Sequence, residues 1–316
     1  MILVFVEHID FQPKKSSLEA LNFANSLSTI DSGEVKAIYL GTRELSINLG
    51  VFGVKEVYHI DCEHNCGSDQ IAAVLSDAIG KLSPKYFMLS HSSLGKTIAG
   101  QIAVKSGMGL ISGAVGVVKE EKVKFRKTVF SGKAYAYYGF NENGGIVTVV
   151  PNSISAESSS NELAQYSTLN LTIPQSQIRS VEKKLVKGKT PLAEATIVVS
   201  AGRGMKDPSN WGMIDELADL LGATTACSRP VADVGWRPHH EHVGQTGIAI
   251  RPNVYIAIGI SGAIQHLAGV NNSRNIIVIN KDPEAPFFKA ADYGICGDLF
   301  EVVPKLNEAI RKAKSV

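Results

Sequence analysis

Residues 254–269 read VYIAIGISGAIQHLAG, a continuous apolar run followed by small residues and then by the start of a helix. Such a run, entering a turn of small residues, predicts a buried strand of a parallel sheet. Ligands of these sheets lie beyond the carboxyl ends of the strands, where helix N-termini can reach them. Gln265 and His266 add hydrogen-bonding side chains that a structural helix start does not require, although a single helical histidine is usually structural. The stretch is therefore a candidate binding site in an α/β domain.

A second turn of this kind follows the strand expected at residues 195–200. Residues 202–204 read Gly-Arg-Gly and precede a helix expected at 209–221, which Gly222 would cap, and another buried strand is expected at 275–280. Two glycine turns beside helix starts suit a pyrophosphate, and a guanidinium can grip phosphate through two hydrogen bonds. Taken alone, Gly-Arg-Gly is equally compatible with a tight turn that carries a surface arginine.

The first half of the chain alternates short strands with amphipathic helices, the pattern of a parallel sheet covered on both faces. Strands are expected at residues 2–6, 35–40, 56–60 and 86–91, and helices at 17–27, 69–81 and 92–105. Residues 95–97 read Gly-Lys-Thr and match the end of a phosphate-binding loop, but Ser90 stands where that loop needs its first glycine. We therefore do not expect such a loop.

The signal becomes β-rich after residue 107. Residues 122–128, 133–140 and 146–150 read as antiparallel strands, with a hairpin turn at 143–145. A polar and then charged connector follows before the α/β pattern resumes. The sequence thus predicts a boundary near residues 187–191 and two domains, 1–187 and 188–316.

Charge and cysteine content exclude several classes of protein. The chain has 32 basic and 30 acidic residues and a net charge of +2, which gives no strong field to gather nucleic acid or anionic lipid. The N-terminus lacks the basic region of a secretory signal, and no stretch approaches the roughly 18 apolar residues of a membrane helix. We expect a soluble cytoplasmic protein with no nucleic-acid partner and no membrane insertion, whose four cysteines are reduced thiols.

Two groups of side chains could ligate a metal by residue type. They are His59, Cys62, His64 and Cys66, and then His239, His240, Glu241 and His242. The first lacks the second cysteine pair of a zinc framework, and the second follows a proline in a loop without helical spacing to aim its side chains. We expect no metal site, and we expect the second group to form a cofactor-edge or surface loop. No nucleophile with its base stands out either, so no catalytic residues are assigned and the sequence favours binding over hydrolysis.

Four segments of the last third form a specific pattern. They are VGQTG at residues 243–247, YIAIGISGAIQHLAG at 255–269, INKDPEAP at 279–286, and ADYGI at 291–295 with DLF at 298–300. This pattern closely resembles the alpha subunit of electron-transfer flavoproteins. The match covers residues 195–306 without a gap, whereas the N-terminal domain agrees only in its α/β layout and its β-rich end.

The resemblance implies a fold, a cofactor and partners. It implies a Rossmann-like N-terminal α/β domain with a β-rich end, which contacts a beta subunit, and a C-terminal parallel-sheet α/β domain that binds FAD. The expected protein is an electron carrier rather than an enzyme. It would take electrons from flavin dehydrogenases, such as the acyl-CoA dehydrogenases of fatty acid beta-oxidation, and pass them to a membrane quinone oxidoreductase or another acceptor. The alternative is an NAD-dependent enzyme on a similar nucleotide-binding core.

The matching motifs also imply the FAD contacts. By position they are Arg203, Ser228, Arg229, Val243, Gly244, Gln245, Thr246, Ser261, Gly262, Ala263, Ile264, Gln265, His266, Asn280, Asp298 and Leu299. Asn280 and Asp298 would serve the ribose or adenine, and Gln245 and Thr246 the flavin or its ribityl chain. Cations at Arg229 and His266 would raise the flavin potential, because reduced flavin carries negative charge. The loop at residues 236–242 is richer in histidine than the commoner family loop, which puts partner docking in question rather than FAD binding.

Overall fold

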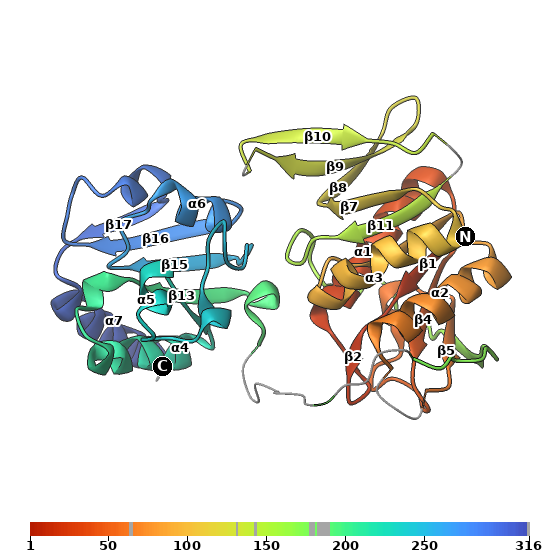
Figure 1. Cartoon of the computed structure of the whole chain (residues 1–316), viewed down its shortest axis with the longest axis horizontal. Helices are drawn as coiled ribbons and strands as arrows, with labels where there is room; N and C mark the ends of the chain where they lie inside the picture. Colours follow the sequence, from red (N-terminus) through yellow and green to blue (C-terminus); the bar gives the residue numbers. More distant parts are fainter. Residues whose placement is uncertain (63–65, 131, 142–143, 177–180, 182–189, 315–316) are drawn as a thin grey trace. The chain divides into compact units, whose positions relative to one another are not determined.

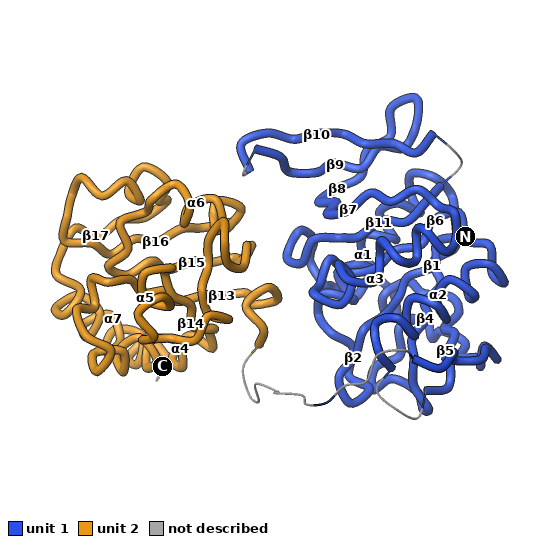
Figure 2. Tube along the Cα trace, in the orientation of Figure 1, with its two compact units in different colours: residues 1–185 blue, residues 186–316 orange. Residues whose placement is uncertain are grey.

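The computed structural model describes residues 1–62, 66–130, 132–141, 144–176, 181 and 190–314. It divides into two compact units, Met1–Leu185 and Val186–Val316 (Figure 2). Each unit has its own parallel sheet with helices on both faces (Figure 1). The domain boundary expected at residues 187 and 188 falls in the segment 182–189, outside the described residues. No helix of the described part is long and apolar enough to cross a membrane.

The first unit is built on a seven-stranded sheet in the order β12-β5-β4-β1-β6-β11-β7, with every neighbouring pair parallel. The strands are β1 (Ile2–Phe5), β4 (Val35–Leu40), β5 (Glu56–Ile60), β6 (Tyr86–Ser90), β7 (Leu110–Ala114), β11 (Gly145–Val149) and β12 (Gln165–Thr168). Between them lie α1 (Lys15–Asp31), α2 (Ser68–Leu82), α3 (Ser93–Ser106), the short 3-10 helix η1 (Leu49–Phe52) and the small hairpin β2 (His8–Ile9) and β3 (Gln12–Pro13).

Two apolar layers hold this sheet between its helices. Successive side chains of a strand point to opposite faces. Accordingly Ile2 and Val4 pack in one core with the buried face of α1, and Leu3 and Phe5 pack in the other with α2 and α3. The strands expected at residues 2–6, 35–40, 56–60 and 86–91 are confirmed to within one residue.

A separate three-stranded antiparallel sheet contains β8 (Gly116–Lys119), β9 (Val123–Val129) and β10 (Ala134–Tyr138). The antiparallel pairing expected for residues 122–128 and 133–140 is confirmed, but the third strand was predicted wrongly. β11 pairs in parallel with β6 and β7 instead of forming a hairpin with β10. All five residues of β11 are buried, which suits the interior of a parallel sheet. The predicted turn lies partly in residues 142–143, outside the described part.

The winding of this sheet changes direction between β1 and β6, where a nucleotide-binding sheet opens its crevice. Glu7, buried just beyond β1, accepts a hydrogen bond from the Ser92 hydroxyl and forms an ion pair with Lys14 at 3.0 Å. Ser92 also caps α3 by accepting a hydrogen bond from the Gly95 N–H at 3.0 Å. Residues 95–97 therefore lie in an ordinary capped helix start rather than in a phosphate loop.

The expectation of four reduced cysteines is wrong for one pair. Cys62 and Cys66 form a disulfide. Cys227 is free and buried and Cys296 is free and exposed. Among the described residues no group of three or more His, Cys, Asp or Glu side chains could hold a metal; His64 is outside that set.

The second unit has a five-stranded parallel sheet in the order β14-β13-β15-β16-β17. Its strands are β13 (Ile197–Ala201), β14 (Thr224–Cys227), β15 (Val254–Ile258), β16 (Asn275–Asn280) and β17 (Tyr293–Cys296). Its α-helices are α4 (Gly212–Leu221), α5 (Arg229–Asp233), α6 (Ile264–Val270) and α7 (Leu299–Lys314). Short 3-10 helices are η2 (Leu192–Glu194), η3 (Arg203–Met205), η4 (Pro208–Trp211), η5 (His239–Glu241) and η6 (Pro286–Ala290).

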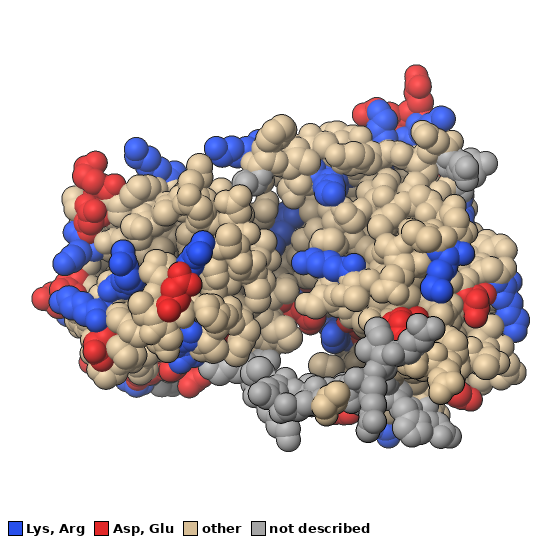
Figure 3. Space-filling view, viewed as in Figure 1, with Lys and Arg blue, Asp and Glu red and all other residues tan. Residues whose placement is uncertain are grey.

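The two faces of this sheet are covered unequally. One core joins α4, α5 and α7 to the sheet, and the other joins α6, η6 and the loop around Val243. The strand predicted at residues 275–280 is confirmed without change, and Gly222 ends α4 in the left-handed conformation with φ 62° as predicted. On the face that Figure 3 presents, basic and acidic side chains are interspersed over both units.

Candidate functional site

The candidate site begins where the winding of the second sheet changes direction, between β13 and β15. Here the two glycine turns touch: the Gly204 N–H donates to the Gly259 carbonyl at 3.1 Å, and a Cβ on Gly204 would lie 2.7 Å from the Gly259 Cα. Gly259 has a φ of 60°, which side chains disfavour. The contact is possible because neither Gly204 nor Gly259 has a side chain. The absence of these side chains leaves main chain exposed at the carboxyl ends of the two strands.

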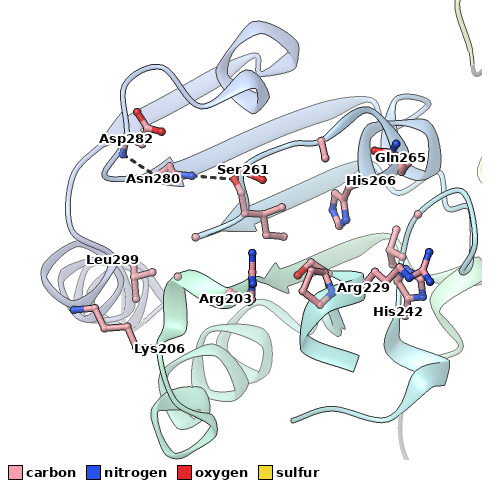
Figure 4. A pocket seen from close by; sticks show the side chains of 18 of the residues that line it. Arg203, Lys206, Arg229, His242, Ser261, Gln265, His266, Asn280, Asp282 and Leu299 are labelled. Carbon is pink, nitrogen blue, oxygen red and sulfur yellow. Dashed lines mark hydrogen bonds between the residues drawn. The ribbon is translucent and has the colours of Figure 1, made fainter. Parts of the chain in front are cut away.

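A cavity of about 840 Å³ lies against these turns, and all its lining residues belong to the second unit. Figure 4 shows two groups of side chains at its ends. Lys206, Leu299, Asn280 and Asp282 lie at one end, and Arg229, His242, Gln265 and His266 at the other. Arg203 lies between the two groups. The cavity is large enough for an elongated ligand with two different ends.

Every predicted contact lines this cavity except Gly262 and Ile264. Gly262 has a φ of 82°, and a Cβ there would lie 2.5 Å from the Phe287 side chain, so its open side packs on η6. The Ile264 side chain is 68% exposed on the first turn of α6. Several residues that line the cavity were not among the FAD contacts predicted from the sequence: Gly204, Lys206, Pro230, His242, Gly259, Ile260, Lys281, Asp282 and Phe300. Lys281 and Asp282 could have been found, because they directly follow Asn280 at a predicted strand end.

The loop that carries Gln245 and Thr246 is held by main-chain contacts. Its Val243 N–H donates to the Cys227 carbonyl at 3.1 Å, and its Gln245 N–H donates to the Gln265 carbonyl at 2.7 Å. A Cβ on Gly269 would lie 2.6 Å from the Gly244 Cα. The loop is thereby fixed to both β14 and α6, which brings segments distant in sequence to one end of the cavity.

At the other end, polar side chains organise the backbone. The Asn280 amide donates to the Ile260 carbonyl at 3.0 Å, and its oxygen accepts from the Asp282 N–H at 3.1 Å. Asp298 accepts a hydrogen bond from the Phe300 N–H at 2.9 Å and so caps α7. These contacts hold the end of β16 and the start of α7 in place beside the cavity.

His266 differs from the cation that the sequence suggested. Its ring is 7% exposed, and its Nε2 lies 2.8 Å from the Tyr255 hydroxyl in the core beneath α6. Burial lowers the pKa of His266 to about 4, so the ring is neutral at neutral pH. Arg229 keeps an exposed side chain whose Nε lies 3.3 Å from Asp233, a surface pair that leaves its charge available to the cavity.

The chain matches two family models, one in each unit. Residues 191–271 match the family model described as "Electron transfer flavoprotein FAD-binding domain", and residues 2–173 match the one described as "Electron transfer flavoprotein domain". The chain belongs to the electron transfer flavoprotein alpha subunit family. It is accordingly an FAD-binding electron carrier, and the NAD-dependent enzyme considered from the sequence is set aside.

Individual relatives of this alpha subunit agree over nearly the whole length. The chain is 35% identical over 319 residues to "Electron transfer flavoprotein subunit alpha" of Bacillus subtilis, covering 98% of this chain and 97% of the relative. It is 36% identical over 324 residues to the protein of that name from Mycobacterium tuberculosis, covering 99% of each. The mitochondrial alpha subunit of Dictyostelium discoideum is 33% identical, with 99% and 92% covered. The resemblance therefore includes the N-terminal unit.

The cavity of this alpha subunit suits the charge of FAD. Arg203 and Lys281 line it, and neither side chain forms a hydrogen bond or ion pair with another residue of the described part. Asp282 and Asp298, the acidic side chains nearby, are already engaged with backbone N–H groups. Two unpaired cations beside exposed main chain suit a pyrophosphate, the doubly charged centre of a dinucleotide.

Proposed function

We propose that this alpha subunit pairs with an electron transfer flavoprotein beta subunit and holds FAD in the cavity of its second unit. It accepts electrons from flavin dehydrogenases, such as acyl-CoA dehydrogenases, in the cytoplasm. It passes them to a membrane quinone oxidoreductase or another acceptor, and its first unit contacts the beta subunit. The observation that carries the proposal is the cavity itself, an elongated space with Arg203 between its two ends, at the point where a parallel sheet binds its ligand.

The two ends of the cavity serve different parts of the cofactor. The pyrophosphate lies by the glycine turns, with Arg203 and Lys281 as its cations. Asn280 and Asp298 hold the ribose or adenine end. Gln245, Thr246 and Arg229 hold the flavin end together with the start of α6, and Ser228 and Ser261 belong to the turns at the pyrophosphate. FAD supplies the electron chemistry, whereas the chain binds it and sets the charge around it.

The test is a binding measurement on the complex. Co-expressed with its beta subunit and purified, the protein is expected to show the visible absorption of bound FAD. Arg203→Ala and Lys281→Ala should each weaken FAD binding about tenfold or more, because a charge-assisted hydrogen bond contributes about 1.5–3 kcal/mol. Lys289→Ala is the matched control, an exposed basic residue of the same unit outside the cavity, and should bind FAD normally. A complex that retains no FAD when saturated with it contradicts the proposal.

A further inference from the structure

His242 is set apart from the other histidines of its loop. His239 and His240 are exposed, whereas His242 is 7% exposed and lines the cavity at the end that it shares with Arg229 and His266 (Figure 4). Its ring forms no hydrogen bond or ion pair with the rest of the described chain. The imidazole is therefore a polar group at the cavity wall that a bound cofactor can contact.

The position of this ring is fixed by backbone rather than by side chains. The His242 carbonyl accepts a hydrogen bond from the Ile248 N–H at 2.9 Å. A Cβ on Gly247 would lie 2.9 Å from Cγ of His242, and one on Gly244 would lie 3.4 Å from its Nε2. The loop at residues 243–247 thus folds closely around the imidazole, and Gln245 and Thr246 of this loop line the same cavity. A ligand that contacts this loop therefore shares this end of the cavity with His242.

Charged and titratable groups of every neighbouring segment act on this ring. Burial lowers its pKa, the carboxylate of Asp233 opposes that shift, and Arg229 and His239 add to it. From the other side, His266 is neutral because burial lowers its pKa, and Cys227 keeps its proton because burial raises its pKa to about 12. His242 is therefore neutral at neutral pH, and a negative charge brought into the cavity raises its pKa toward that range.

We propose that His242 takes up one proton from solvent as the FAD beside it gains one electron, and so balances the added negative charge. The inference rests on the proposed placement of the flavin at this end of the cavity. The electron comes from the donor protein, the proton binds a ring nitrogen, and no other bond is made or broken. His242 serves better than His266, whose Nε2 is already engaged by Tyr255 at 2.8 Å and whose pKa of about 4 lies further from neutrality.

The first experiment measures the one-electron potential of the alpha–beta complex as a function of pH. Each tenfold change in proton concentration changes a proton-coupled equilibrium tenfold, or about 59 mV for one electron. Up to that slope is expected in the wild-type complex between the two pKa values of His242. His242→Gln, which retains polarity but does not titrate, should flatten the curve there. His240→Gln, an exposed position of the same loop, should follow the wild type. Equal slopes in all three overturn the proposal.

A second measurement does not depend on any variant. Imidazole titration by nuclear magnetic resonance in the wild-type complex should place the His242 pKa at least about one unit higher with reduced than with oxidised FAD, a tenfold change in proton affinity. An unchanged pKa refutes the role of His242 even where the complex holds FAD firmly. A wild-type complex that holds no FAD contradicts the proposed function, so the two failures are distinguishable.

Discussion

The two units treat the same position of a parallel sheet in opposite ways. In the first, the crevice between β1 and β6 receives the Glu7 carboxylate, which bonds Ser92 and Lys14. In the second, the glycine turns meet at the equivalent position between β13 and β15, and the side chains of Arg203 and Lys281, unpaired among the described residues, line the cavity against these turns. The first unit thus has an acidic side chain of its own at this position, whereas the second has basic side chains that suit an anionic ligand. Sheet winding alone therefore does not decide which unit binds a nucleotide.

The largest effect on FAD binding and stability is expected from a side chain placed at the contact between Gly204 and Gly259. In Gly204→Val the new side chain meets the Gly259 main chain, with the Cβ alone at 2.7 Å, and cannot turn away. We expect loss of bound FAD and destabilisation of the second unit by at least about 3 kcal/mol. FAD content and tryptophan fluorescence measure both, since Trp211 and Trp236 lie in that unit. Gly212→Ala is the control, because nothing lies within 4 Å of its Cβ.

Acid is expected to destabilise both units by a similar amount. Burial lowers the pKa of His266 to about 4, and burial with Lys96 and Lys127 nearby lowers that of His91 to about 4. Each ring binds its proton more readily when unfolded, so stability present above pH 6.5 is lost as the pH falls toward 4, about 3 kcal/mol per ring. Urea unfolding between these limits measures the loss. His91→Gln should reduce the loss of stability with falling pH in the first unit and leave that of the second unit unchanged.

The internal anion of the first unit is expected to stabilise that unit without affecting the cofactor. Glu7→Ala removes the carboxylate that Ser92 and Lys14 contact and should cost about 2 kcal/mol, in the range of hydrogen bonds to charged groups. Hydrogen exchange of β1 and α3 reports the change. Glu34→Gln, an exposed position, should have no effect. If Glu7→Ala also lost FAD from the second unit, the two crevices would not be independent.

The smallest effect is expected at the rim of the second crevice. Arg229 and Asp233 form an exposed pair one turn apart, so Asp233→Asn should change the free energy of unfolding by less than about 0.5 kcal/mol. Arg229→Ala should leave stability equally unchanged while lowering the flavin potential, because it removes a cation from the cavity. Potentiometric titration separates the two variants. An unchanged potential in Arg229→Ala would remove this residue from the flavin end.

Local sequence patterns predicted most strands but not how they pair. The run at residues 275–280 is apolar, bounded by polar residues and buried between neighbours, so its signal is complete within itself. The run at β11 looked the same whether it paired in parallel or as a hairpin, because pairing direction depends on distant partners. Proximity of an earlier antiparallel pair therefore gave the wrong answer.

In the candidate site, too, local sequence patterns predicted positions but not what depends on distant segments. Residues after strand ends, such as Arg203 and Asn280, could be predicted because parallel strands end on one edge. The neutral state of His266 could not, since it arises from burial against Tyr255 and from charges on other segments. His242 was considered with its whole loop, as a metal ligand or as part of a cofactor-edge or surface loop, because its sequence neighbours are exposed histidines and nothing local distinguishes its burial.

The contact between Gly204 and Gly259 also constrains how this chain can vary. Each glycine occupies space that a side chain on the other would need. A side chain at either position would therefore clash with the main chain of the other, whatever residue stands there. No compensating second change can rescue the first. The two positions are therefore expected to stay glycine together through divergence, and a homologue that has lost one should have lost its flavin as well.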